Sequence, residues 1–338
     1  MKFLVVGLGS MGKRRVRCLQ SLGYKNIVGF DLRQDRRNET LQKYGIRTYS
    51  DVFKAIDEFN PDALIISVPP HIHHEYIKLA IKNNKHFFVE ASVVDTDMDE
   101  IKKNLRDVSI VAAPSLTMTF HPAIKQIIAI IKSGDLGTIS NVIFHSGQYL
   151  PDWHTYENVS DYYVSNPATG GAREIVPFEV SWITQILGFP KRVCGNVRKT
   201  INIEGAEKID DTYNFLFDYD HSLAVITIDV VSRSATRRLL INGDQKQLIW
   251  DWNQKNIQIY DAKIDKWQIL EYEMGKAASG YNQNIGENMY IDELKGFIEA
   301  INGNKPFINT MENDHNVLKL LYAIEESDKT KKFIEFKI

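Results

Sequence analysis

The sequence predicts an α/β protein with two parts: an N-terminal Rossmann-type doubly wound parallel sheet, and a C-terminal α+β region with an open, mostly antiparallel sheet. Two observations predict this fold class, one for each part. Short apolar runs alternate with amphipathic stretches, and the runs are nearly continuous in apolar residues, as strands buried on both faces of a parallel sheet require. From Ile139 onward the pattern changes to a period of two, separated by turn residues such as Asn242-Gly243-Asp244, which is typical of antiparallel strands.

These patterns place the individual elements. In the first part we expect strands at Phe3–Val6, Ile27–Phe30, Ala63–Ile66, Phe87–Val89 and Ile110–Ala113. Between them we expect helices at Met11–Leu22, Asp51–Phe59, Glu75–Asn83 and Asp97–Leu105. The later strands are predicted at Thr212–Tyr219, Leu223–Val231, Arg238–Ile241, Gln247–Trp252 and Asn256–Tyr260. Helices that frame them are predicted at Ala123–Lys132, Glu174–Leu187, Asn288–Ile301 and Asn313–Glu326. A chain of 338 residues exceeds one ordinary core, so we expect domains at 1–118 and 119–338.

The composition is that of an ordinary globular protein. Hydrophobic residues make up 43% and charged residues 25%, and the formal net charge of −2 gives no electrostatic reason to expect a nucleic-acid partner. No apolar run approaches the ~20 residues that cross a bilayer, so no membrane association is expected. The two cysteines, Cys18 and Cys194, lie far apart and form no disulfide framework, which favours a cytoplasmic location.

A glycine-rich turn carries the strongest motif. Gly7-Leu8-Gly9-Ser10-Met11-Gly12 follows the first predicted strand and opens the first predicted helix, which is the context of a dinucleotide-binding loop. Asp31 ends the second strand, where a carboxylate binds the ribose 2′-hydroxyl of NAD and repels the 2′-phosphate of NADP. NAD is therefore the predicted cofactor. NADP remains the second possibility, because nearby arginines could accept a 2′-phosphate: Arg33, Arg36 and Arg37.

The first helix begins with an unusual run of positive charge: Lys13, Arg14, Arg15 and Arg17. A helix N-terminus disfavours cations, so a bound pyrophosphate would offset this charge. The alternative is that these long side chains simply point into water.

Three further segments resemble the glucose–fructose oxidoreductase/inositol dehydrogenase (Gfo/Idh/MocA) family. They are Ser67-Val68-Pro69-Pro70-His71-Ile72-His73-His74, Lys85-His86-Phe87-Phe88-Val89-Glu90 and Gly170-Gly171-Ala172. The resemblance implies an NAD(P)-dependent oxidoreductase that acts on a sugar, sugar acid or nucleotide sugar. It implies that Val68, Pro69, Pro70 and His71 line the nicotinamide side of the site, and that Glu90 touches the ribose or carboxamide. Alternatively, the prolines only end the strand. No metal site is expected, because the three histidines of the first segment, His71, His73 and His74, have no carboxylate or cysteine at a suitable spacing.

The sequence departs from the family at its proton carriers. The family's E-K-P reads Glu90-Ala91-Ser92, so alanine replaces the lysine, and the family's D-x-x-x-H pair falls on Ile175 and Glu179. Glu179 is therefore the first candidate for general acid or base, provided that burial tunes its pKa. The alternatives are a solvated helix residue or an ion-pair partner of Arg173.

The segment that leads to the Gly170-Gly171 turn is rich in aromatic and polar residues. Aromatic faces stack on sugar rings and polar groups bind hydroxyls, so Trp153 and Tyr156, together with Arg173, are predicted substrate contacts. His154 is the second candidate proton carrier. The alternative is that this loop packs on a neighbouring subunit.

Three functions remain open: hydride transfer between the cofactor and a carbinol carbon, a non-redox NAD-using lyase or glycosidase, and a non-catalytic dinucleotide-binding sensor. The alternating apolar residues of the later strands also predict a homodimer or homotetramer formed through the C-terminal sheet.

Overall fold

The computed structural model describes residues 1–153, 157–277 and 284–338. The chain forms two compact units, and each combines two stretches of sequence. The first contains Met1–Thr117 and Glu287–His315, and the second contains Met118–Gly286 and Asn316–Ile338. The segment 287–315, which the sequence analysis placed in the second domain, therefore belongs to the first unit.

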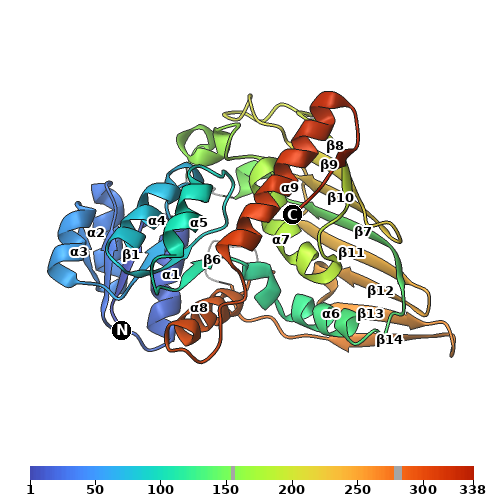
Figure 1. Ribbon diagram of the computed structural model, residues 1–338, viewed down its shortest axis with the longest axis horizontal. Helices are drawn as coiled ribbons and strands as arrows, with labels where there is room; N and C mark the ends of the chain where they lie inside the picture. Colours follow the sequence, from blue (N-terminus) through green and yellow to red (C-terminus); the bar gives the residue numbers. More distant parts are fainter. Residues whose placement is uncertain (154–156, 278–283) are drawn as a thin grey trace. The chain divides into compact units, whose positions relative to one another are not determined.

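The first unit is built on a six-stranded sheet in the order β3-β2-β1-β4-β5-β6, and every neighbouring pair is parallel (Figure 1). Its strands are β1 (Phe3–Val6), β2 (Ile27–Phe30), β3 (Arg47–Tyr49), β4 (Ala63–Ile66), β5 (His86–Val89) and β6 (Ala112–Pro114). Strands β1 and β4 are buried at every position, as their unbroken apolar sequences predict. The strand order reverses between β1 and β4, and ligands of doubly wound sheets bind outside the carboxyl ends of strands at such a point.

Helices connect these strands. They are α1 (Ser10–Ser21), α2 (Gln34–Tyr44), α3 (Val52–Phe59), α4 (His73–Lys82) and α5 (Met98–Leu105). Helix α8 (Glu287–Ile301) also belongs to this unit, although it follows β14 in the chain. A short 3₁₀ turn, Pro70–Ile72, precedes α4. Helix α2 and strand β3 were not predicted. Helix α2 was missed because its sequence shows no apolar stripe; Thr40 is its only buried residue.

The second unit is built on a nine-stranded sheet in the order β14-β13-β12-β11-β7-β10-β9-β8-β15. Its strands are β7 (Ile139–Gly147), β8 (Arg192–Arg198), β9 (Thr212–Asp218), β10 (Leu223–Asp229), β11 (Thr236–Gly243), β12 (Lys246–Asp251), β13 (Asn256–Asp261), β14 (Lys266–Glu271) and β15 (Ile334–Glu335). Only β7 and β10 run parallel; the other pairs are antiparallel. The predicted fold class is confirmed.

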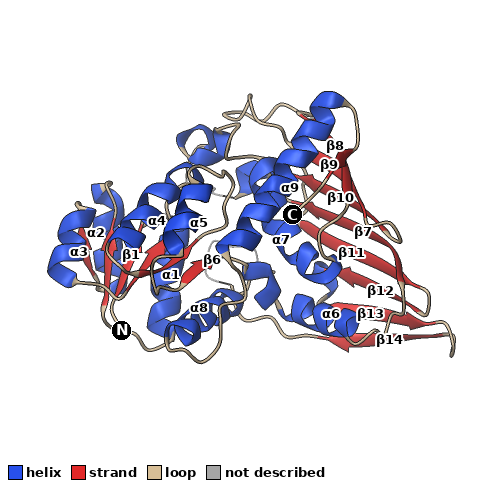
Figure 2. Ribbon diagram, viewed as in Figure 1, coloured by secondary structure: helices blue, strands red, loops and turns tan. Residues whose placement is uncertain are grey.

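One face of this sheet is covered by helices (Figure 2). Helices α6 (Pro122–Lys132) and α7 (Ala172–Leu187) belong to the second unit, and α9 (Met311–Thr330) begins in the first unit and continues into the second. Short 3₁₀ turns occupy Thr117–Phe120, Leu150–Asp152, Val159–Asp161, Tyr163–Ser165 and Trp252–Gln254. Along β10 the exposed Leu223 and Val225 alternate with the buried Ala224 and Ile226, so the opposite face stays accessible.

Helix α8 joins the first unit because it packs against α1 through charged groups. Glu293 is fully buried and lies 2.9 Å from the Arg15 guanidinium, and Glu287 accepts a hydrogen bond from Arg17 at 2.5 Å. These pairs connect residues that are far apart in the sequence, and a local hydrophobic pattern does not predict them.

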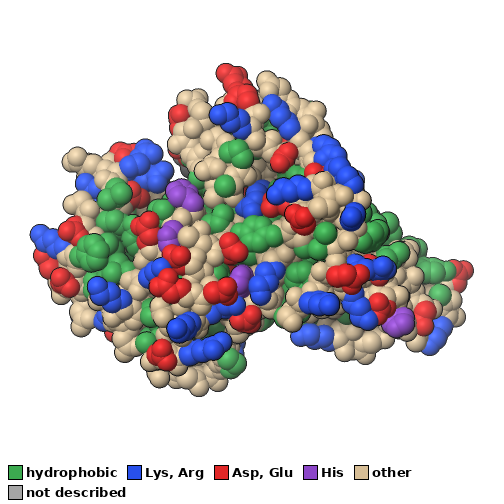
Figure 3. Space-filling view, turned by 45° about the horizontal axis from the view of Figure 1, so that its top comes forward, with side chains coloured by type: hydrophobic (Ala, Val, Ile, Leu, Met, Phe, Trp, Pro, Cys, Tyr) green, Lys and Arg blue, Asp and Glu red, His purple; other side chains and the backbone are tan. Residues whose placement is uncertain are grey.

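Within the described residues, no helix is long and apolar enough to cross a membrane. On the face shown in Figure 3, basic and acidic side chains are interspersed, with no single-sign patch over one group of elements.

Candidate functional site

The glycine turn of the first unit has the geometry of a dinucleotide loop. Gly7 adopts a φ of +89°, and a Cβ at this position would lie 2.6 Å from the carbonyl oxygen of Ser67. A Cβ on Gly12 would lie 1.8 Å from the Gly7 carbonyl oxygen, so only glycine allows helix and turn to pack this closely. Gly9 is the N-cap of α1 and supplies no side-chain cap to the first turn. The turn therefore suits the close approach of an anion to the start of a helix, as a pyrophosphate requires.

Asp31 lies directly after β2 and is fixed by backbone donors. Its Oδ2 accepts a hydrogen bond from the Leu8 N–H at 2.8 Å, and its Oδ1 accepts one from the Arg33 N–H at 2.8 Å. Only 7% of the residue is exposed. The carboxylate is thus held against the glycine turn, as a ribose-binding acid must be.

The nearby arginines are largely engaged elsewhere. Arg33 forms a bidentate pair with Asp35, and Arg37 donates to the carbonyl oxygens of Asp31 and Leu32. Arg36 remains close to Asp31, with 3.8 Å between its guanidinium and the carboxylate. It is the cation best placed to receive a 2′-phosphate if the carboxylate were removed.

Asp31→Ser should therefore change cofactor preference. We expect the wild type to bind NADH about 10²-fold more tightly than NADPH, because carboxylate and 2′-phosphate repel each other. The variant should bring the two affinities within about 10-fold, with Arg36 holding the phosphate. Fluorescence titration of both reduced cofactors measures this ratio. Tighter binding of NADPH by the wild type would contradict the assignment.

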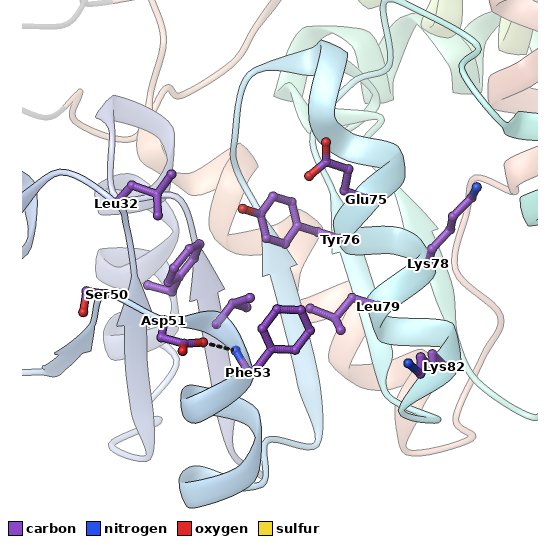
Figure 4. Close-up of a pocket in the computed structure, with 11 residues that line it drawn as sticks. Leu32, Ser50, Asp51, Phe53, Glu75, Tyr76, Lys78, Leu79 and Lys82 are labelled. Atoms are coloured by element: carbon purple, nitrogen blue, oxygen red, sulfur yellow. Dashed lines mark hydrogen bonds between the residues drawn. The ribbon is translucent and has the colours of Figure 1, made fainter.

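An open hollow with a volume of about 570 Å³ lies in the same unit, and its lining includes Phe30 and Leu32, the residues on either side of Asp31 in the sequence (Figure 4). Its apolar lining comes from β2, α3 and α4 and from the residues that follow β2: Phe30, Leu32, Val52, Phe53, Tyr76 and Leu79. Leu32 is 77% exposed and Phe53 is 63% exposed, so the hollow presents apolar surface to a ligand. The negative charge of Asp31 contributes to the raised pKa of Tyr76, whose main cause is burial. A flat aromatic ring could fill this hollow beside the ribose site.

The positive charges of α1 do not simply point into water. Arg15 is fully buried and donates two hydrogen bonds of 2.7 Å to the Glu90 carboxylate. Lys13 pairs with Glu39 at 2.7 Å, and Arg14, 2% exposed, lies 3.5 Å from Glu287. Protein carboxylates therefore balance much of this charge, and a contact with a pyrophosphate stays a prediction.

The turn after β4 contains the residues expected beside the nicotinamide. Pro70 is buried and begins the 3₁₀ turn, while His71 is exposed. The Val68 carbonyl accepts a 2.9 Å hydrogen bond from Nε2 of His73, and burial lowers the pKa of that imidazole to about 4, so it is neutral. Glu90 at the end of β5 accepts from Ser67 at 3.0 Å as well as from Arg15. Cofactor contacts for Val68, Pro69, Pro70, His71 and Glu90 stay predictions.

In the second unit, Glu179 is buried without any exposed surface on α7. Its Oε1 accepts from Ser146 Oγ at 2.9 Å and from Arg237 Nε at 2.6 Å, and its Oε2 accepts from Trp182 Nε1 at 2.8 Å. A general base needs an accessible oxygen within reach of the proton that it takes. The surroundings of Glu179 suit a different role: holding Arg237 in one orientation.

Of the other residues predicted for this unit, the structure describes Arg173 and Trp153. Arg173 is 8% exposed, pairs with Glu325 at 2.6 Å and donates to the Ala168 carbonyl, so it stabilises the start of α7. Trp153 is partly exposed after the turn at Leu150–Asp152. His154 and Tyr156 lie outside the described residues.

Sequence reasoning missed Arg237 and His121. Arg237 lies in β11, and its guanidinium stacks on the ring of Trp252 at 4.5 Å and on that of Phe178 at 5.9 Å. His121 is 1% exposed, and burial, with the nearby Arg237 charge, lowers its pKa to about 3. The adjacent Arg237 and Arg238 were one signal in the sequence. Adjacent residues of a strand point to opposite faces of the sheet, so one of the two arginines must face the helix-covered side and needs a partner there.

Glu174 in the first turn of α7 is a second acid that the sequence did not single out. Its Oε1 accepts a 2.5 Å hydrogen bond from the Tyr163 hydroxyl, and its buried Oε2 has no partner among the residues that the structure describes. Burial raises the pKa of Glu174 from 4.5 to about 7, although the tyrosine hydrogen bond lowers it. Between about pH 4.5 and about pH 7, Glu174 is therefore protonated in the folded chain and ionised in the unfolded chain.

This shift predicts a pH-dependent stability. Because the folded-state pKa is raised, Glu174 destabilises the fold as the pH rises from about 4.5 through about 7. Glu174→Gln should be more stable than the wild type by about 2 kcal/mol at pH 8 and nearly equal to it at pH 5. Urea unfolding at both pH values measures the difference, with the exposed Glu204→Gln as control. Equal effects of Glu174→Gln at both pH values would refute the burial argument.

Comparisons with known proteins identify two successive family domains in the chain. A family model described as "Oxidoreductase family, NAD-binding Rossmann fold" matches residues 1–121, and the "GFO/IDH/MocA C-terminal domain" matches residues 124–249. Myo-inositol 2-dehydrogenase of Thermotoga maritima is 22% identical over 350 residues, covering 99% of this chain and 98% of the relative.

Solved structures share the fold at low sequence identity. Levoglucosan dehydrogenase in complex with NADH and levoglucosan superposes with a TM-score of 0.85 at 15% identity, covering 100% of both chains. A probable dehydrogenase from Thermotoga maritima superposes with a TM-score of 0.81 at 20% identity, covering 99% of each chain.

Proposed function

Because the chain belongs to the Gfo/Idh/MocA oxidoreductase family and its first unit is an NAD-binding Rossmann domain, we propose that it is an NAD-dependent dehydrogenase of a sugar-like alcohol. The observation that carries the proposal is the glycine turn with Asp31 fixed against it, since both features suit the pyrophosphate and ribose of NAD. We assign the hollow lined by Phe30 and Leu32 to the adenine ring. Bound NAD would accept a hydride from a carbinol carbon.

The substrate class is inferred from the relatives. Two of the similar proteins are dehydrogenases named for myo-inositol and for levoglucosan, and both of these compounds are polyhydroxylated rings. The proposed substrate is therefore a sugar or sugar derivative. Trp153 and Tyr156 are proposed to stack on or hydrogen-bond such a ring. Arg173 is not retained in this role, because its guanidinium is engaged by Glu325 and the Ala168 carbonyl.

We propose that the chain works without the family's lysine, since Ala91 follows Glu90 where the family has E-K-P. The anchoring of Glu90 by Arg15 and Ser67 supports a role for this carboxylate in holding the loop after β5. His154 is the proposed proton carrier, and Glu179 is a positioning residue that acts through Arg237.

The proposal is tested by following absorbance at 340 nm with the full chain, NAD⁺ and a panel of inositols, anhydrosugars, aldoses and sugar acids. We expect net NADH formation with at least one of them. Product formed without net reduction would instead indicate a non-redox enzyme. Tight NAD binding with no product from any sugar would indicate a dinucleotide-binding sensor.

We also propose that a second copy of the chain covers the open face of the nine-stranded sheet. Strand pairing lines up one row of residues across that face: Cys194, Leu216, Val225, Ile143, Leu240, Ile249, Gln258 and Ile269. All except Gln258 are apolar, and Ile143 is 50% and Ile269 is 60% exposed. A mostly apolar row across the accessible face of the sheet supports a homodimer, or a homotetramer that contains it.

Ile143→Glu should therefore dissociate the assembly while leaving the fold intact. A charge at the centre of the apolar row should weaken association by at least about 10²-fold. Light scattering at micromolar concentration measures the mass, and Leu41→Glu, at an exposed leucine of α2, is the matched control. A wild type that is monomeric at this concentration would refute the proposed interface.

A cytoplasmic location is proposed on the state of the cysteines. Cys18 is buried in α1 and Cys194 lies in β8, and both are free thiols. Free thiols are the rule in a reducing compartment.

A further inference from the structure

Arg237 keeps unused hydrogen-bond donors in an otherwise satisfied cluster. Its Nε donates to Glu179, but neither terminal nitrogen has a partner among the described residues. The side chain of Arg237 is 11% exposed, and its two terminal nitrogens are not among the fully buried atoms that lack a partner. The exposed surface of the guanidinium therefore lies at these two nitrogens. A guanidinium presents a planar fork of donors that matches a carboxylate.

The orientation of this fork is fixed from three sides. Glu179 holds Nε, and Glu179 itself is held by Ser146 and Trp182. The ring of Trp252 supports one face of the guanidinium at 4.5 Å, and the indole N–H of Trp252 donates to the Ala235 carbonyl at 3.1 Å. A side chain held in this way loses little conformational entropy when it binds a ligand.

The charge balance favours a ligand with a single negative charge. Glu179 already offsets part of the positive charge of Arg237. The neighbouring basic side chain, His121, is neutral at ordinary pH because burial and the Arg237 charge lower its pKa to about 3. A phosphate monoester, which carries up to two charges, would meet only one partly balanced cation, whereas a carboxylate matches the fork in both geometry and charge.

We infer that Arg237 binds the carboxylate of the substrate, so the substrate class is sugar acids. This inference rests on the proposed function, because it specifies the alcohol that the dehydrogenase oxidises. It also explains why a fully buried glutamate replaces the family's histidine on α7: Glu179 orients the carboxylate-binding cation.

The test compares D-glucuronate with D-glucose and with glucose 6-phosphate, using the full chain and NAD⁺. We expect kcat/KM for glucuronate to exceed that for glucose by about 10²-fold, the value of one charge-assisted bidentate contact. Arg237→Lys should lower this preference about 10-fold, since lysine keeps the charge and loses the fork. Arg238→Met is the matched control, because Arg238 is adjacent in β11, mostly exposed and paired with Asp251, and should leave the preference unchanged.

Removing Arg237 alone would leave the Glu179 carboxylate buried without its cation, which threatens folding. The double variant Glu179→Gln/Arg237→Met avoids this and should abolish the preference for the acid. Retention of the preference in this variant, or a wild-type preference for glucose or for glucose 6-phosphate, would overturn the inference.

A binding measurement separates this inference from the proposed function. Calorimetric titration of glucuronate into the NAD⁺-loaded protein needs no turnover. Binding that is lost in the double variant supports the role of Arg237 even if no sugar is oxidised, in which case only the dehydrogenase proposal fails. Equal binding of glucuronate by the wild type and the double variant overturns the inference, whatever the turnover.

Discussion

Glu293→Ala is expected to destabilise the protein by about 3–5 kcal/mol, the cost of breaking a buried ion pair. The carboxylate has no exposed surface, lies 2.9 Å from the Arg15 guanidinium, and accepts hydrogen bonds from the Leu116 N–H and from the hydroxyls of Ser115 and Thr117. Alanine would leave these donors unpaired. Scanning calorimetry should show the unfolding temperature falling by about 10 °C.

Glu299→Ala is the matched control, because Glu299 lies on the same helix and pairs with Lys305 at a partly exposed position. Its loss should cost about 1 kcal/mol or less. Equal effects of the two variants would mean that the buried cluster of Arg15, Glu90 and Glu293 does not attach α8 to α1.

The second large effect is expected from His154→Gln, compared with Glu179→Gln. If His154 carries the proton, its loss should lower kcat by about 10²–10⁴-fold and remove the corresponding limb of the pH–rate profile. Glu179→Gln acts on substrate orientation through Arg237, so it should mainly raise KM and leave the shape of the profile unchanged. Steady-state kinetics from pH 5 to 9 separate the two roles.

NAD affinity is the control for both variants and should stay at the wild-type value. A pH limb that disappears in Glu179→Gln, with normal turnover in His154→Gln, would restore Glu179 as the proton carrier. No effect of either variant would exclude both residues from proton transfer.

Local patterns predicted most strands and helices that have one clear apolar face, although β8, in which buried and exposed residues alternate, was missed. The unbroken apolar runs of Phe3–Val6 and Ala63–Ile66 predicted β1 and β4 with correct bounds, and the period-two residues predicted β9 to β13. Elements without such a face were missed. Strand β14 is exposed at nearly every position, and the polar surface of α2 resembles that of a loop. The grouping of α8 with the first unit comes from contacts between residues far apart in the sequence, such as the Arg15–Glu293 ion pair and the packing of Phe297 on Phe88.

The candidate site was predictable where a motif demands one residue type. Only glycine fits at Gly7 and Gly12, and an acid is expected after β2 in a dinucleotide-binding domain, so the sequence singled out both the loop and Asp31. The partners of charged side chains could not. Glu179 was expected to be solvated, to pair with Arg173 or to carry a proton, and its actual partner, Arg237, comes from a strand 58 residues later.

The most direct test of the central claim is the transfer of deuterium from substrate to cofactor. The full chain is incubated with NAD⁺ and a sugar acid that is deuterated at each carbinol carbon, and the reduced cofactor is analysed by mass spectrometry. Our account predicts NADH that carries deuterium at nicotinamide C4, together with the corresponding keto acid. Product that forms while the cofactor remains unlabelled NAD⁺ would contradict it, because hydride transfer to NAD would then not be the reaction that this protein catalyses.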